Sequence, residues 1–174
     1  MNSAQIMWTD VITAVLSQPT FDMTIGNMGY VFKNMIAKYV SSADSYRVSN
    51  GVCELVIEKD TDLMDKISGG LQIDMKKYFY GKDKPTLLEH TIPTSVIAQC
   101  LIDLGPSPDK CSVSNVLKNS GAVVIVLRTE DKLLAKSKMP PGWVIGDSIY
   151  ARYEEAGVII SESIFVKRDR NIYR

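Results

Sequence analysis

Few residues of this 174-residue chain could carry out catalysis, and its single histidine, His90, stands in the segment LLEHTIPTS. A histidine next to a carboxylate can act as a general base, and Glu89 directly precedes His90. A lone histidine close to the start of a helix is more often a structural or solvent-exposed residue. We therefore predict no catalytic residue and no enzymatic activity for this chain.

Acidic residues alternate at Asp60, Asp62 and Asp65, a spacing that loosely matches a calcium-binding loop. The glycine at the sixth position and the glutamate at the twelfth position of an EF-hand loop are missing. A solvated acidic turn accounts for the pattern better. Glu154 and Glu155 are neighbours on an expected helix and point in different directions, which argues against a catalytic carboxylate pair.

The chain has three cysteines, namely Cys53, Cys100 and Cys111. They are too few and too far apart in sequence for a disulfide framework or a zinc site. Reduced cysteines of this kind are typical of a reducing compartment. The glycines match no nucleotide-binding fingerprint. We expect neither a metal nor a cofactor.

Basic and aromatic residues alternate in the segment KKYFYGKDK. Its lysines are Lys76, Lys77, Lys82 and Lys84, and its aromatic residues are Tyr78, Phe79 and Tyr80. Such a segment can hold phosphates while its rings stack on bases. Lysines on the solvated face of a strand with aromatic residues in the core would give the same pattern, so contact with RNA or lipid stays one of two interpretations.

A second basic group lies near the C-terminal end and contains Lys167, Arg168, Arg170 and Arg174. Asp169 interrupts it. This group is either a second basic patch that can contact a partner or a solvated end of the chain.

The segment KSKMPPGWVIGD, residues 136–147, combines residues that prevent regular structure with apolar residues. We call it the proline loop, and its residues of interest are Met139, Pro140, Pro141, Trp143 and Val144. Burying one tryptophan contributes roughly 4–6 kcal/mol at most. We therefore expect Trp143 to be buried by contact with other residues. These belong either to the protein's own core or to an external partner, namely a second copy or a membrane surface.

The whole chain has 20 basic and 20 acidic residues, a sequence pI near 6.6 and 45% hydrophobic residues. This balance predicts one folded domain over 1–174 and gives no global attraction to nucleic acid or anionic lipid. No apolar run is long enough to cross a bilayer, and no basic residue precedes the first apolar stretch, so we expect neither secretion nor a membrane span.

Apolar periodicity predicts an amphipathic helix capped by Thr9 and ended by Pro19, and a second helix after Gly26. A third helix is expected from Thr94 to Gly105, and a short one over 148–156. Residues 60–70 are read as a short helix or a loop.

The segment YRVSNGVCELVIEKD predicts a hairpin turning at Asn50-Gly51, and LQIDMKKYFY, residues 71–80, alternates as a strand does. The apolar run 122–131 predicts the central strand, and 158–169 predicts a long strand or a hairpin. The expected fold class is α+β, with helices packed on a mostly antiparallel sheet.

The order of these motifs resembles the rhabdovirus matrix protein family. In the N-terminal stretch TDVITAVLSQPTFDMTIGNMGYVFKNMIAKYVSS, the spacing agrees at Asp10-Val11, Ala14-Val15, Ile25-Gly26 and Phe32-Lys33. In the C-terminal third, a strand over Gly121 to Arg128, an acidic turn, a Pro- and Trp-containing loop, a short helix and GVIISESIFVKRD follow in the same order. The resemblance covers about half of the chain and leaves residues 45–118 unaligned.

The resemblance implies a structural protein that self-associates, condenses the viral nucleocapsid and supports assembly and budding beneath the envelope. Its partners would be further copies of itself, the nucleocapsid, an anionic membrane surface and the viral glycoprotein, with RNA contacted weakly or indirectly. It would occur in the virion, at host membranes or in the host cytoplasm, and in the nucleus for some members. The proline loop would touch the membrane or another copy, and the alternative function is a nucleic-acid-binding accessory protein that acts through Lys76 to Lys84.

Two departures from the family pattern bear on this expectation. Pro140-Pro141 is followed by Gly142-Trp143 and not by the tyrosine of a budding motif. The lysine-rich N-terminal arm of the animal-virus members is also missing here, and a short chain of this kind suits the plant rhabdoviruses.

Overall fold

The computed structural model describes residues 1–168 of the chain. It contains helices and a five-stranded mixed sheet, so the predicted α+β class is confirmed. The chain divides into two compact units. The helical unit comprises Met1–Ala43, His90–Ala122 and Ala135–Ala151, and the sheet unit comprises Asp44–Glu89, Val123–Leu134 and the residues from Arg152 onward. A single domain over 1–174 stays a prediction.

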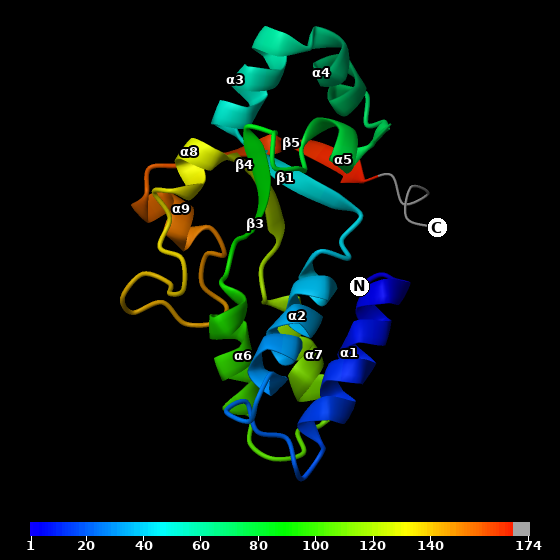
Figure 1. The fold of residues 1–174 in the computed structure, drawn as a ribbon, viewed down its shortest axis with the longest axis vertical. Coiled ribbons are helices and arrows are strands. Elements are labelled where there is room, and N and C mark those ends of the chain that lie inside the picture. Colours follow the sequence, from blue (N-terminus) through cyan, green and yellow to red (C-terminus); the bar gives the residue numbers. More distant parts are fainter. Residues whose placement is uncertain (169–174) are drawn as a thin grey trace. The chain divides into compact units, whose positions relative to one another are not determined.

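Four helices build the helical unit (Figure 1): α1 (Ser3–Leu16), α2 (Met28–Val40), α6 (Thr94–Ile102) and α7 (Lys110–Lys118). The stripe predicted for α2 is buried at Phe32, Ile36, Tyr39 and Val40. Helix α1 packs against both α2 and α7. The core of this unit therefore includes the apolar face of α2 that the helical periodicity predicts.

Helix α1 is capped seven residues earlier than the sequence pattern predicts, at Asn2 and not at Thr9. Asn2 caps it, because its side chain accepts a hydrogen bond from the Gln5 amide at 3.0 Å while the Gln5 side chain accepts one from the Asn2 amide at 3.1 Å. This reciprocal pair is a capping box with Asn and Gln in its two places. Thr9, the predicted cap, is instead buried inside the helix and donates to the Gln5 carbonyl at 2.9 Å.

Helix α7 was not predicted from the sequence. Asp109 starts it by accepting hydrogen bonds from the amides of Cys111 and Ser112 and from the Ser112 hydroxyl. These bonds lower the pKa of the Asp109 carboxyl, with the Ser112 hydroxyl as the largest cause. Helix α6 begins at Thr94, with Pro93 in the cap position.

The sheet unit contains the remaining elements, which are β1 (Ser45–Ser49), α3 (Asn50–Lys59), α4 (Thr61–Ser68), β2 (Gln72–Ile73), α5 (Met75–Tyr78), β3 (Thr86–His90), β4 (Val123–Leu127), α8 (Arg128–Asp131), α9 (Ala151–Glu155) and β5 (Ile160–Arg168). The strand order is β2-β5-β1-β4-β3. Strand β1 runs parallel to β4 and antiparallel to β5, and β2 runs parallel to β5. The sheet is therefore mixed, which corrects the prediction of a mostly antiparallel sheet.

The predicted hairpin at Asn50-Gly51 is wrong, because both residues open helix α3. Ser49 ends β1 and caps this helix by accepting from the Val52 amide at 3.3 Å. The Ser49 hydroxyl also donates to Glu130 Oε2 at 2.6 Å. A Cβ atom on Gly51 would lie 2.6 Å from Glu130 Oε1, so glycine at this position serves close packing and not a turn.

The strand predicted over 71–80 is reduced to the two residues of β2 and is followed by α5. Asp74 caps α5 by accepting from the Lys77 amide at 3.1 Å, which ends the extended conformation. Strand β4 is confirmed as an interior strand, with Val123–Val126 buried, but it ends at Leu127, and residues 128–131 of the predicted strand form helix α8 instead. Strand β5 is confirmed as one long strand.

Candidate functional site

Glu89, the expected partner of His90, is engaged in an ion pair within the sheet unit. Arg152 Nη2 donates to Glu89 Oε1 at 2.9 Å, and the Arg152 side chain is fully buried while that of Glu89 is 22% exposed. A carboxylate in this position neutralises the buried guanidinium. Its charge is thus used for the stability of the sheet unit.

The acidic segment from Asp60 to Asp65 also has a structural role. Asp60 caps α4 by accepting from the Leu63 amide at 3.0 Å, while Asp62 and Asp65 lie exposed on the helix. Within residues 1–168, no group of histidine, cysteine, aspartate or glutamate side chains has an arrangement that could hold a metal ion. Glu154 and Glu155 are both exposed on α9.

The proline loop has an ordered conformation that is closed by hydrogen bonds at its Trp143 end. The Trp143 amide donates to the Pro140 carbonyl at 3.2 Å, and the Val144 amide donates to Asp147 Oδ2 at 3.0 Å. The Asp147 amide returns a bond to the Val144 carbonyl at 3.1 Å, and Trp143 Nε1 donates to the Ser148 carbonyl at 3.0 Å. The backbone around Val144 is thereby fixed from both sides.

This conformation divides the predicted loop residues between core and solvent. Met139 is buried, and Pro140 and Trp143 are half-buried. Pro141 is exposed, and Val144 has 61% of its surface exposed. The loop therefore covers part of its own unit with Met139 and Trp143 and presents Val144 to the outside.

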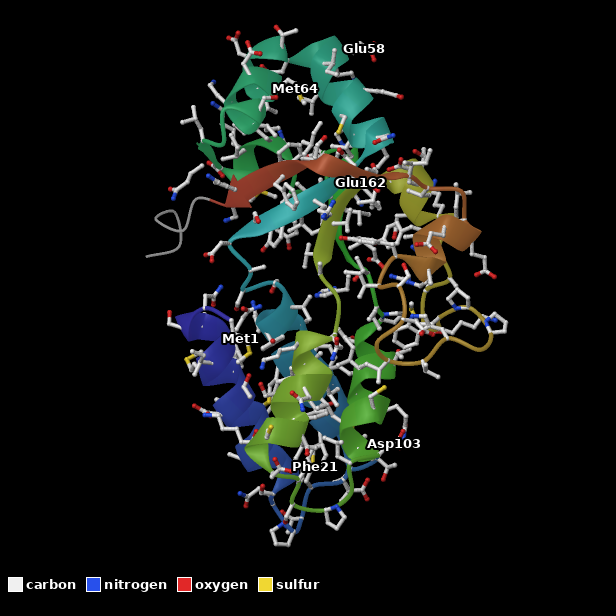
Figure 2. All side chains as sticks on the ribbon, turned by 180° about the vertical axis from the view of Figure 1, so that it is seen from behind. Met1, Phe21, Glu58, Met64, Asp103 and Glu162 are labelled. Carbon is white, nitrogen blue, oxygen red and sulfur yellow. The ribbon has the colours of Figure 1, made fainter. Side chains whose placement is uncertain are left out.

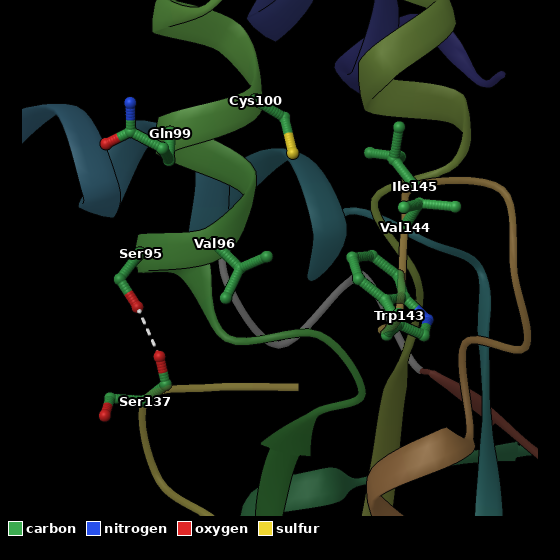
Figure 3. Close-up of a pocket in the computed structure, with 8 residues that line it drawn as sticks. All are labelled: Ser95, Val96, Gln99, Cys100, Ser137, Trp143, Val144 and Ile145. Atoms are coloured by element: carbon green, nitrogen blue, oxygen red, sulfur yellow. Dashed lines mark hydrogen bonds between the residues drawn. The ribbon is translucent and has the colours of Figure 1, made fainter. Parts of the chain in front are cut away.

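A groove of about 450 Å³ separates the proline loop from α6 (Figure 3). It is lined by Ser95, Val96, Gln99, Cys100, Ser137, Trp143, Val144 and Ile145. The Ser95 hydroxyl donates to the Ser137 carbonyl at 3.3 Å and ties the start of the loop to the helix. Burial raises the pKa of the Cys100 thiol, so this cysteine stays in its protonated, weakly reactive form.

The loop's supporting residues were not predicted from the sequence. Asp147 and Ser148 close the turn, and Val96 and Cys100 of α6 form the opposite wall of the groove. An aspartate three residues after Val144 is a usable signal, since aspartate side chains often accept bonds from nearby backbone amides. The wall from α6 has no local signal, because it depends on the tertiary packing of the helical unit.

Both predicted basic groups lie in the sheet unit. Strand β2 pairs with β5 in the register Gln72↔Lys167, and α5 with Lys76 and Lys77 begins two residues after β2. Lys76, Lys77 and Lys82 are exposed, Lys84 is half-buried and Lys167 is exposed. We call these five lysines the basic surface. The backbone of Arg168 ends β5, and Arg170 and Arg174 lie outside the described residues.

The aromatic residues of the basic surface are less available than the sequence pattern predicts. Phe79 is buried, and Lys77 Nζ lies 4.9 Å from the centre of the half-buried Tyr78 ring. The contact with Tyr78 raises the pKa of the Lys77 ammonium. Tyr80 is 55% exposed and is the most accessible ring of the three.

Among residues 1–168, no helix is both long and apolar enough to pass through a bilayer. The candidate surfaces of the sequence analysis are the proline loop, which lines a groove, and the basic surface. Comparison with known proteins identifies no relative: no protein-family model, curated protein or solved structure matches this chain significantly.

Proposed function

We propose that this chain is a self-associating structural protein of the rhabdovirus matrix type, which condenses a nucleocapsid against the inner face of a viral envelope. The observation that carries the proposal is the ordered presentation of Val144 on the proline loop. An apolar side chain held outward by a closed turn loses little conformational freedom when it binds. The loop is therefore suited to contact with a second copy or with the apolar part of a membrane.

A single contact of this kind is weak. Full burial of a valine side chain contributes about 1.5–3 kcal/mol, which is far less than the 8 kcal/mol or so of a micromolar complex. Linked copies would add their contacts, because each further contact forms at a high effective concentration. Self-association therefore follows as the working state of the proposed protein.

The basic surface supports the second half of the proposal. Each lysine near an anionic membrane contributes about 1 kcal/mol, and this contribution falls with added salt. The five lysines lie on a chain with a formal net charge of zero, so the attraction is local. The same surface suits the acidic or phosphate-bearing side of a nucleocapsid.

The resemblance in motif order supports the family assignment within this proposal. The elements that carry it are α1 and α2 in the N-terminal part, and β4, the proline loop, α9 and β5 in the C-terminal part. The proposed places of action are the space beneath the viral envelope, the host cytoplasm and host membranes. The proposed partners are further copies, the nucleocapsid and the viral glycoprotein.

The alternative, a nucleic-acid-binding accessory protein, has less support. Binding of single strands relies on several exposed rings, and burial of Phe79 leaves Tyr80 as the most accessible one. Phosphate contacts without base stacking give only weak binding to single-stranded RNA. RNA is therefore proposed as a weak or indirect partner.

Two matched variants test the proposal. Val144→Asp and Leu133→Asp each place a charge at an exposed apolar position in irregular structure, with 61% and 64% of the wild-type side chain exposed. Sedimentation velocity should show weaker self-association for Val144→Asp and wild-type behaviour for Leu133→Asp. Equal behaviour of both variants would remove the proline loop from the proposed function.

A further inference from the structure

The loop between α1 and α2, residues 17–27, has open space on two sides, and we call it the connecting loop. On one side, a pocket of about 240 Å³ lies between the loop, the end of α1 and α2. On the other side, a recess of about 800 Å³ lies between the loop and Gln99 and Ile102 of α6. Thr20 and Phe21 line both spaces. Figure 2 shows Phe21 at the end of the helical unit where this loop runs, with Asp103, the residue after α6, at the same end.

The connecting loop is held by hydrogen bonds within its own turns and to the start of α2. The Thr24 amide and hydroxyl both donate to Asp22 Oδ1, at 2.8 Å and 2.7 Å. The Phe21 amide donates to the Gln18 carbonyl at 3.0 Å, and the Asp22 amide donates to the Met28 sulfur at 3.3 Å. None of these bonds reaches α6. The loop can therefore shift relative to α6 and open the pocket without breaking them.

The pocket beside α2 is lined almost entirely by apolar atoms. Two of its walls are the rings of Phe21 and Phe32, whose centres lie 4.9 Å apart with the planes inclined by 58°. Met28 and Met35 add two thioethers, which are flexible and polarisable and adapt to the shape of what they contact. Such a lining is typical of a site for an apolar ligand.

Water is a poor occupant of this pocket. A well-held internal water needs about two to four polar partners. Gln18 and Thr20 are the polar residues of the lining, and the Gln18 amide already donates to the Ala14 carbonyl at 3.2 Å. A hydrocarbon would instead restore the dispersion contacts that the open space takes from the lining. The chemistry of the walls thus selects an apolar occupant.

We propose that this pocket binds a compact aromatic molecule of about the size of indole, with the connecting loop as its cover. A cavity of roughly 150 Å³ holds benzene, whereas sites for drug-sized ligands begin at roughly 300 Å³, and the pocket lies between these sizes. Phenyl rings pack edge-to-face or offset on another ring, and thioether sulfur prefers the edge of a ring. Phe21, Phe32 and the two methionines therefore favour a ring over a linear chain. Binding here needs neither self-association nor a membrane, so it stands apart from the proposed function.

A titration of the ¹⁵N-labelled wild-type chain with indole tests the site by NMR. The amide shifts should change in a saturable way at residues 15–35. The linear probe 1-hexanol, of comparable hydrophobicity, should bind at least fivefold more weakly. Shifts that do not saturate, shifts confined to the groove beside the proline loop, or tighter binding of 1-hexanol overturn the proposal.

Filling the pocket gives the second measurement. Val15 lines the pocket from α1, and Val15→Phe should occupy it and weaken indole binding at least tenfold. Val11→Phe, a change of the same kind at a half-buried position of α1 outside the lining, is the matched control and should bind as the wild type does. Val31→Phe, at a lining position that is 46% exposed, fills the same pocket with less demand on the core. Wild-type affinity in both filling variants, or equal weakening in Val11→Phe, overturns the assignment.

Discussion

The indole nitrogen of Trp143 donates a hydrogen bond to the carbonyl oxygen of Ser148 at 3.0 Å, and this bond closes the proline loop on itself. The ring also lines the groove beside α6. Trp143 is therefore the residue that holds the loop in shape, while Val144 is the residue that the loop presents.

Replacing Trp143 tests whether the shape of the loop matters for the contact that Val144 makes. Trp143→Ala should loosen the loop and lower both self-association and vesicle binding, while far-UV circular dichroism stays unchanged because the side chain is only half-buried. Trp143→Phe keeps a ring in the groove and loses the hydrogen bond, so an intermediate effect is expected. Identical association of both variants and wild type in sedimentation velocity would show that loop order does not matter.

Lysine neutralisation tests the basic surface. Lys76→Gln should weaken binding to vesicles that contain anionic lipid by about 1 kcal/mol, or roughly fivefold. Lys132→Gln, at another exposed lysine, serves as the control. A vesicle cosedimentation assay at low and at high salt measures the binding of both variants. A difference between the two variants that persists at high salt would argue against an electrostatic contact.

The buried ion pair predicts a large loss of stability in the sheet unit. Glu89→Ala removes the carboxylate that neutralises Arg152 and should lower the free energy of unfolding by about 3 kcal/mol, toward the lower end for a broken buried pair because Glu89 is partly exposed. Glu155→Ala, at an exposed position of α9, should change it by less than about 0.5 kcal/mol. Urea unfolding compares them, and a similar midpoint for both variants would contradict the structural assignment of the pair.

Asp109 predicts a pH-dependent contribution of α7. Its hydrogen bonds lower the pKa of the carboxyl from 3.8 in the folded protein, so the contribution to stability is present above about pH 4. It is lost as the pH falls through the lowered pKa. Asp109→Ala should reduce stability at pH 7 and should make the acid transition less steep below about pH 4. Parallel pH–stability curves for the variant and the wild type would contradict this.

Strongly periodic elements of the fold could be predicted from the sequence. The structure buries the stripe of α2 at Phe32, Ile36, Tyr39 and Val40, although Val31 of the same stripe is 46% exposed, and it buries the apolar run of β4 from Val123 to Val126. Helix α7 has an equally clear start at Asp109, but its apolar positions are too few to stand out without the cap.

The predicted hairpin at Asn50-Gly51 and the predicted strand over 71–80 are wrong because helix caps override the local strand pattern. Ser49 and Asp74 each end an extended segment by accepting a hydrogen bond from an amide three residues later. The chain after Ser49 then continues as helix α3, because burial of the β-branched Val52 and Val56 compensates for their lower helix propensity. The basic surface could be predicted only as two separate groups, since the register Gln72↔Lys167 depends on sheet topology.

The candidate site could be predicted in part. The composition of the proline loop indicates an unusual surface, and the sequence singles out Met139, Trp143 and Val144 as residues that need an explanation. Which of them faces solvent depends on the hydrogen bonds to Asp147 and Ser148 and on the wall formed by α6.

The most direct measurement of the central claim is a concentration series of the wild-type chain in sedimentation velocity, with and without vesicles that contain anionic lipid. The account predicts a weight-average sedimentation coefficient that rises with protein concentration, and vesicle binding that rises more steeply than a single-site curve. A coefficient that stays at the monomer value across the series, together with no vesicle binding, would contradict it.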